Sequence, residues 1–305
     1  MGTLRGQVGL RRNVTVSRKY GEGCVSAKER ILHSMTRSDF VRGTYGVLQK
    51  IPLIGVGVRK LVHATMPPGM KLWIQIPDGL GKGLWIYADP RSELGYTNGD
   101  HEPWIQELLK AELHQGDCYY DVGAHTGFFC LIASRFVGSS GAIVAFEPDP
   151  VNVDALQTNI AKNGLTQVSV AEAAVWCSPG HVAFERASDS SNRTQGHVSS
   201  AKDPGLELIL VPAVRLDDFI FSQGHPAPHL VKMDVEGAEW EALQGARHLL
   251  TEAQPKLLCE VHDPTQVGQI RAFLEGIGYT TEEWNPVHPR YSDYRQLYLW
   301  AIRKH

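Results

Sequence analysis

The sequence has few cysteines and no long apolar run, the features that mark disulfide-rich, zinc-binding, secreted and membrane proteins. The 305 residues include only five cysteines, which are scattered and form no C-x-x-C pair. We therefore predict neither disulfides nor a zinc site, and a reducing, cytoplasmic environment. No uninterrupted apolar run follows the first basic residues or reaches the length of a membrane span, so we expect neither a signal peptide nor stable membrane insertion.

A strong overall charge is also missing, but the charge is unevenly distributed. The net charge is −3, yet residues 1–60 hold 12 Lys and Arg against 3 Asp and Glu, and the remaining residues hold 18 against 30. A region this acidic would repel phosphate backbones, so we expect no nucleic-acid partner. The chain is predicted to have a basic, partly flexible or helical extension over residues 1–70, a β-hairpin with its connecting loop over 71–100, and the main domain over 101–305.

A loop with two glycines follows the first strongly apolar strand pattern, at residues 118–122. Gly123 and Gly127 allow the backbone to turn sharply and to approach a ligand closely. The helix that follows would point its free amides and the positive end of its dipole at an anionic group. A dinucleotide site needs glycine where His125 and Phe128 stand. The D-x-G-x-x-x-G spacing is instead typical of sites for S-adenosylmethionine (SAM).

An acidic residue ends the next predicted strand. Glu147 follows the apolar run 142–146, and its carboxylate could accept hydrogen bonds from both hydroxyls of a ribose. The alternative is that Glu147 caps the next helix, but Asp149 and Asn152 can do this without it. Ala174, after the third strand, could lie against an adenine or could only ease packing. We assign cofactor contacts to Asp121, Gly123, Ala124, His125, Gly127, Glu147 and Ala174.

Strand and helix patterns alternate along the rest of the chain, which predicts a Rossmann-like, doubly wound, mostly parallel α/β sheet. We expect seven strands, with the third over residues 168–174, a helix over 238–250 and a long polar loop over 186–205. The last two strands, near 279–283 and 296–302, have no helix between them. They should therefore form a hairpin that gives the sheet an antiparallel edge strand.

Acidic residues and a histidine stand where the fourth and fifth core strands end. Asp234, Glu236 and His262 should lie at the carboxyl edge of the sheet, where doubly wound folds bind ligands. If the acceptor is an alcohol, Asp234 or His262 could take its proton, although His262 could equally be a surface histidine. The cluster also contains ligand types for a divalent ion, but its spacing is not diagnostic and we assign no metal. Glu239 is interpreted as negative charge at a helix start.

Several blocks of residues resemble the FkbM family of SAM-dependent methyltransferases. They are G-D-H-E-P at residues 99–103, Y-D-V-G-A-H-T-G at 120–127, F-E-P at 146–148 and V-K-M-D-V-E-G-A-E at 231–239. The last block is the most specific, and the resemblance extends over about residues 95–300. His125 and Thr126 stand where the family often has Asn and an aliphatic residue.

The resemblance implies a class I methyltransferase domain over residues 101–305, with SAM as cofactor and Glu102 among the residues that contact it. It also implies methylation of a hydroxyl on a sugar, a polyketide or another small natural product. The expected partner is thus a small-molecule or glycan acceptor, and the oligomeric state stays open, with a homo-oligomer as one alternative. Two other classes are considered, a non-catalytic SAM-binding scaffold and an NAD-dependent oxidoreductase, and His125 and Phe128 argue against the latter.

Overall fold

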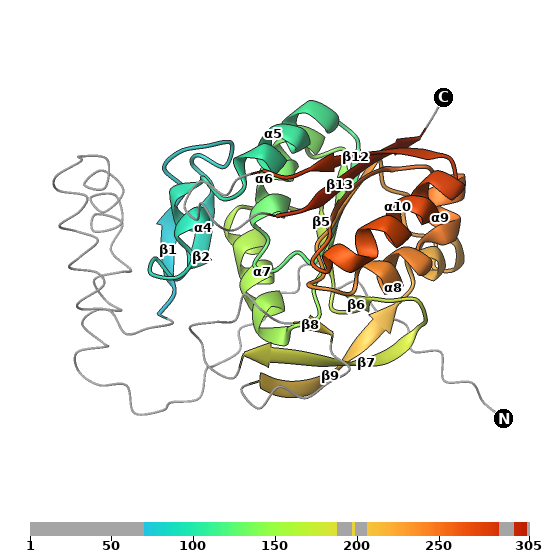
Figure 1. The fold of residues 1–305 in the computed structure, drawn as a ribbon. Coiled ribbons are helices and arrows are strands. Elements are labelled where there is room, and N and C mark those ends of the chain that lie inside the picture. The colour runs from blue at the N-terminus through green and yellow to red at the C-terminus, as the bar shows by residue number, and fades with distance from the viewer. Residues whose placement is uncertain (1–69, 188–196, 199–205, 287–295, 304–305) are drawn as a thin grey trace. The chain divides into compact units, whose positions relative to one another are not determined.

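A computed structural model describes residues 70–187, 197–198, 206–286 and 296–303 (Figure 1). The chain divides into two units at Pro103 and Trp104, and each unit is described by itself. The predictions for residues 1–69 and for most of the polar loop 186–205 lie outside the described residues. Within the described part of the chain, no helix combines the length and the apolar character needed to cross a membrane.

The smaller unit contains a two-stranded antiparallel pair, β1 (Leu72–Gln75) with β2 (Trp85–Ala88). A short helix, α4 (Leu94–Asn98), follows and ends at Gly99, whose φ is 84°. A Cβ atom at Gly99 would lie 2.2 Å from the carbonyl oxygen of Asp78. Only glycine therefore fits both the left-handed backbone and the close contact at this turn.

A seven-stranded sheet forms the larger unit, in the order β12-β13-β11-β10-β3-β4-β5. All neighbouring pairs are parallel except those that involve β13, which is antiparallel to both β11 and β12. The predicted doubly wound, mostly parallel sheet is therefore confirmed, and the final hairpin closes one edge of it. The strands are β3 (Cys118–Val122), β4 (Ala142–Phe146), β5 (Val168–Ala171), β10 (Leu230–Met233), β11 (Lys256–Glu260), β12 (Tyr279–Trp284) and β13 (Tyr298–Arg303).

Helices cover the sheet on both sides, as Figure 1 shows, with α6 and α7 on one side and α8, α9 and α10 on the other. Alternate strand residues such as Tyr120, Phe146 and Met233 share one buried apolar cluster with Leu243 and Leu249 from the second group of helices. Burial on both faces explains the near-continuous apolar strands. The helices are α5 (Pro103–Glu112), α6 (Phe128–Val137), α7 (Pro150–Lys162), α8 (Glu239–Gln244), α9 (Arg247–Glu252) and α10 (Val267–Gly276), with short helical turns at Asp218–Ser222 and Pro264–Gln266.

A second, four-stranded sheet has the order β6-β9-β7-β8. Its strands are β6 (Ala174–Val175), β7 (Gly180–Ala187), β8 (His197–Val198) and β9 (Leu206–Val214). This sheet corrects the prediction of a third strand that runs as far as Ala174. The amide of Ala173 donates to the carbonyl of Ala171 at 2.9 Å, which turns the chain, and Ala174 then pairs with Ala213 of β9.

The predicted single helix over residues 238–250 is two helices, α8 and α9, interrupted at Gly245. A Cβ at Gly245 would lie 2.1 Å from the carbonyl oxygen of Trp176, so main chain packs directly on this residue. The carboxylate of Asp217 then accepts hydrogen bonds from the amides of His248 (3.1 Å) and Leu249 (2.8 Å) in the first turn of α9. This side chain satisfies two amides that the interrupted helix would otherwise leave without partners.

We predict that Asp217→Ala lowers the free energy of unfolding by about 1–2 kcal/mol, because it removes the cap of α9. The neighbouring Asp218→Ala is a matched control, since its side chain is 36% exposed and pairs only loosely with Arg215, at 3.6 Å. The control should change the free energy by no more than about 0.5 kcal/mol. Urea denaturation of the three proteins compares these values, and equal losses in both variants would contradict the capping role.

Candidate active site at the carboxyl ends of four strands

The predicted site residues of the larger unit lie mainly where β3, β4, β10 and β11 end. These four strands are parallel and adjacent in the sheet, so the segments that follow them emerge at the same edge. Asp234 directly follows β10 and His262 lies just beyond β11. This edge is where open α/β sheets bind their ligands.

The loop after β3 touches the segment after β10 through main-chain atoms. Gly123 has a φ of 82°, and a Cβ atom there would lie 1.7 Å from the carbonyl oxygen of Asp234. The sequence suggested that this glycine leaves room for a ligand. The structure shows that a neighbouring loop already occupies the space, so Gly123 positions Asp234 beside the loop.

Three amides of the same loop bind the end of β4. The amides of Gly123 and Ala124 both donate to the carbonyl of Phe146 at 3.0 Å, and the amide of His125 donates to Glu147 at 2.8 Å. His125 has a φ of 51°, which is uncommon for a residue with a side chain. These amides therefore fasten two strand ends together and are not directed at a bound anionic ligand.

Glu147 is 4% exposed, and its two carboxylate oxygens both accept hydrogen bonds from protein. Besides His125, the donors are the amide of Asp149 at 2.9 Å and the side-chain amide of Asn152 at 3.3 Å. Asp149 itself caps α7, which leaves Glu147 free of that task. Burial raises the pKa of Glu147 to about 7, although these hydrogen bonds oppose the shift. Since a carboxylate offers about four acceptor positions, one remains for a ligand hydroxyl.

Asp121 is enclosed by protein, with an exposed fraction of 0%. The thiol of Cys130 donates to its carboxylate at 3.1 Å, and the ammonium of Lys232 lies 3.9 Å from its other oxygen. Burial raises the pKa of Asp121, and the charge of Lys232 partly offsets this. Its visible task is to hold Lys232 in place, since its side chain has no surface from which to contact a ligand.

Two other predicted cofactor residues have different surroundings. Ala174 belongs to a small buried cluster with Phe184 and Val211 in the second sheet, which accounts for its small side chain by packing. Glu102 lies in the smaller unit, where its carboxylate is 3.7 Å from the ring of His101. Gly127, in contrast, belongs to the loop itself and precedes the first turn of α6 with a φ of 88°.

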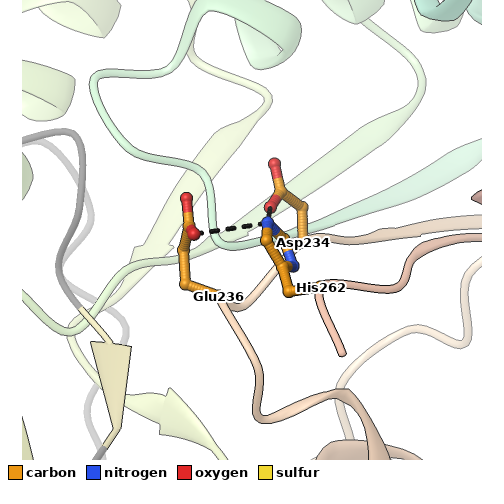
Figure 2. A group of neighbouring side chains, drawn as sticks. All are labelled: Asp234, Glu236 and His262. Atoms are coloured by element: carbon orange, nitrogen blue, oxygen red, sulfur yellow. Dashed lines mark ion pairs between the residues drawn. The ribbon is translucent and has the colours of Figure 1, made fainter. Parts of the chain in front are cut away.

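The three predicted catalytic residues come together, as Figure 2 shows, with the side chains of Asp234 and Glu236 directed at the ring of His262. Nε2 of His262 lies 3.3 Å from Glu236 and 3.7 Å from Asp234. One donor atom from each of the three residues lies within 4.8 Å of the others, a grouping that could hold a metal ion. Asp234 also pairs with Lys232 at 2.9 Å.

Glu239 is a member of this cluster that the sequence analysis assigned only to the helix start. It does begin α8 and accepts a hydrogen bond from the amide of Gly237, but its side chain is fully buried. Its carboxylate lies 2.8 Å from Nδ1 of His262. Glu260, at the end of β11, lies 3.8 Å from Nε2 of the same ring. The close spacing of Asp234, Glu236 and Glu239 in the sequence was the available signal, but it could not identify the ring that these acids contact.

The charges in this cluster change one another's protonation. Burial alone would lower the pKa of His262, but the hydrogen bond to Glu239 and the three other carboxylates around the ring raise it to about 10. At neutral pH the ring is therefore an imidazolium. Burial and the nearby charge of Asp234 raise the pKa of Glu236 to about 7. The cluster concentrates negative charge beside the glycine loop.

The chain matches the model of a known family, the methyltransferase FkbM domain. The matched residues, 121–281, make up just over half of the chain. They begin at the aspartate of the glycine loop and include the whole 231–239 block and His262. His262 and the four acids around its ring, Asp234, Glu236, Glu239 and Glu260, therefore all lie inside the matched segment.

Curated relatives with related sequences are also methyltransferases. Hexuronic acid methyltransferase AglP of Haloferax volcanii is 28% identical over 199 residues, which cover 65% of this chain and 74% of that protein. The 31-O-demethyl-FK506 methyltransferase FkbM of Streptomyces tacrolimicus is 31% identical over 195 residues, which cover 55% of this chain and 75% of that protein. The crystal structure of methyltransferase FkbM from Methylobacillus flagellatus KT is 17% identical, with a TM-score of 0.45, and covers 84% of this chain and 62% of its own.

We predict that Gly123→Ala lowers the free energy of unfolding by about 2–5 kcal/mol, from left-handed strain plus overpacking against Asp234. Gly164→Ala is the matched control, because Gly164 has a φ of 66° but nothing within 4 Å of the added atom. In this control the free energy of unfolding should fall only by the cost of the left-handed strain, about 1–2 kcal/mol. If chemical denaturation gives the same loss for both variants, the loop contact does not constrain the site.

Proposed function

The chain belongs to the FkbM methyltransferase family, and from this premise we propose that it transfers a methyl group from SAM to a hydroxyl of a small molecule or glycan. The observation that carries the proposal is the position of the Asp234, Glu236 and His262 cluster. It lies directly beside the D-x-G-x-x-x-G loop, because Gly123 packs on the backbone of Asp234. An acceptor held at the cluster would thus be adjacent to a cofactor held at the loop.

SAM would be held by the residues at the ends of β3 and β4. We place its ribose at Glu147, which keeps an acceptor position, and its remaining parts along the loop 123–127. Within the larger unit, the residues proposed to form or support the cofactor site are Asp121, Gly123, Ala124, His125, Gly127, Glu147 and Ala174. Within that set, the enclosed Asp121 acts by holding Lys232, and Ala174 acts by packing.

In the reaction, the acceptor oxygen attacks the methyl carbon of the sulfonium. The new O–C bond forms while the C–S bond breaks, and the electron pair of that bond returns to sulfur, which leaves S-adenosylhomocysteine. The hydroxyl proton passes to a base, and we place Asp234 in that role because it directly follows β10 beside the loop. The protein's main contribution is alignment, since the sulfonium is already a good electrophile.

The class of acceptor is suggested by the relatives and by charge. One relative is named for hexuronic acid and another for 31-O-demethyl-FK506, so both act on small or sugar-type acceptors. Residues 61–305, with 18 basic against 30 acidic residues, would repel a nucleic-acid backbone. A non-catalytic scaffold remains the second candidate, and its test is the absence of any methylated product.

The reaction is tested with labelled SAM and an extract of the source organism, followed by mass spectrometry of the labelled product. We expect the label on oxygen. Asp234→Asn should lower turnover by about 10²–10⁴-fold while SAM still binds, because a general base contributes that much. Glu282→Gln, an exposed substitution in β12, is the control and should turn over normally. Label only on nitrogen or carbon would refute O-methylation, and full activity of Asp234→Asn would refute the base.

The role of Glu147 predicts a pH dependence of adenosine binding. Adenosine carries the ribose but not the titrating amino acid of SAM. Because the pKa of Glu147 is raised to about 7, the carboxylate is protonated below that pH and loses acceptor capacity. Adenosine affinity should therefore rise by up to about tenfold per pH unit toward pH 7 and then level off.

The control for this experiment is Glu147→Gln, which cannot titrate. Its adenosine affinity, followed by NMR titration from about pH 5.5 to 8.5, should be weaker and independent of pH. Glu147→Ala should also weaken SAM binding, by roughly 1–3 kcal/mol for a lost charge-assisted bond. An unchanged pH slope in Glu147→Gln would exclude the ribose contact.

A further inference from the structure

The side chains of Asp234, Glu236 and His262 each place one potential metal-ligand atom in the same small region. These atoms lie within 4.8 Å of one another, and Nε2 of His262 is 3.3 Å from Glu236. Ligands bound to one Mg²⁺ at about 2.0–2.1 Å lie no more than about 4 Å apart, and those of the somewhat larger Mn²⁺ only slightly farther. Small side-chain rotations are therefore enough to bring all three donors onto one ion.

The ring of His262 is oriented by a carboxylate behind it. Oε1 of Glu239 lies 2.8 Å from Nδ1, and this contact turns Nε2 toward the two other acids. Histidines that bind metals usually donate their second ring N–H to a carboxylate in this way. Glu239 is fully buried, and among the described residues its Oε2 has no hydrogen-bond partner. One oxygen of this buried carboxylate contacts His262 while the other has no partner among the described residues, which is a second sign that the cluster accommodates positive charge.

Asp234 can serve an ion without giving up its partner. Its Oδ2 lies 2.9 Å from the ammonium of Lys232, whereas its Oδ1 faces His262 at 3.7 Å. The first oxygen can keep the ion pair while the second binds a metal. Glu236 is 40% exposed, so water can reach the cluster and complete a six-coordinate shell.

We propose that Asp234, Glu236 and His262 bind one divalent metal ion of the class of Mg²⁺ and Mn²⁺. Two carboxylates favour such hard cations, and Mn²⁺ also accepts an imidazole ligand. The ion takes the place of the proton on Nε2, which is released to solvent. Its catalytic role, which rests on the proposed methyl transfer, is to hold the acceptor oxygen and to make its hydroxyl easier to deprotonate. With the ion bound, Asp234 acts through the ion as its ligand instead of taking the proton directly.

The test is a titration of the full chain with Mn²⁺, with free ion measured by electron paramagnetic resonance. One ion should bind per chain and be displaced by Mg²⁺. Glu236→Gln and His262→Gln should weaken binding by at least about tenfold, and Glu239→Gln by roughly 10–100-fold through the ring it orients. Glu282→Gln removes an exposed carboxylate elsewhere and should bind Mn²⁺ like the unaltered chain.

Circular dichroism checks that each variant folds. If the His262→Gln variant does not fold, because this side chain is half-buried, the Glu236→Gln variant alone tests the metal site. Failure of the unaltered chain to bind Mn²⁺, or equal binding in Glu236→Gln, would overturn the site. The titration contains neither SAM nor acceptor, so its outcome is independent of methyl transfer. If labelled product forms but Mn²⁺ does not bind, the metal site is rejected and the proposed methyl transfer stands. If Mn²⁺ binds but no labelled product forms, the metal site stands and the proposed methyl transfer is rejected.

Discussion

Main-chain contact between the Gly123 loop and the segment after β10 is the constraint on which the site depends. β3 and β10 are neighbours in register, with Val122 opposite Met233, so both chains leave the sheet at the same level. Only a residue without a Cβ lets them touch there. Because the contact is made by backbone atoms, it sets the spacing of the two segments before any side chain takes part.

The charged side chains around this contact orient one another more than they stabilise the fold. Lys232 lies between Asp121 and Asp234 and sits 5.2 Å above the ring of Phe129, where water is largely excluded. Buried ion pairs return little net stability because desolvation offsets their attraction, but breaking one is costly. The arrangement therefore aims Asp234 while the apolar layers on both faces of the sheet supply the folding energy.

Local patterns in the sequence were enough to predict the parallel sheet and to place Asp234, Glu236 and His262 at one edge of it, because strand ends follow from apolar runs and topology. The parts that were wrong or missed depend on contacts between distant residues. The third strand ends early because Ala174 pairs with β9, and Glu239 meets a ring 23 positions away. No periodicity records such pairings, and the roles of the cofactor residues stay predictions.

The position of β13 has a consequence for how the chain is made. This strand is the last of the sheet to be synthesised, yet it lies between β11 and β12 and not at the rim. Until residues 298–303 emerge, the outer edge of β11 is open, and its Leu257 and Leu258 are residues that the finished sheet buries completely or nearly so. An open edge of apolar strand pairs readily with other chains. A polypeptide cut just before β13 would thus lose two strand pairings at once and become prone to aggregate.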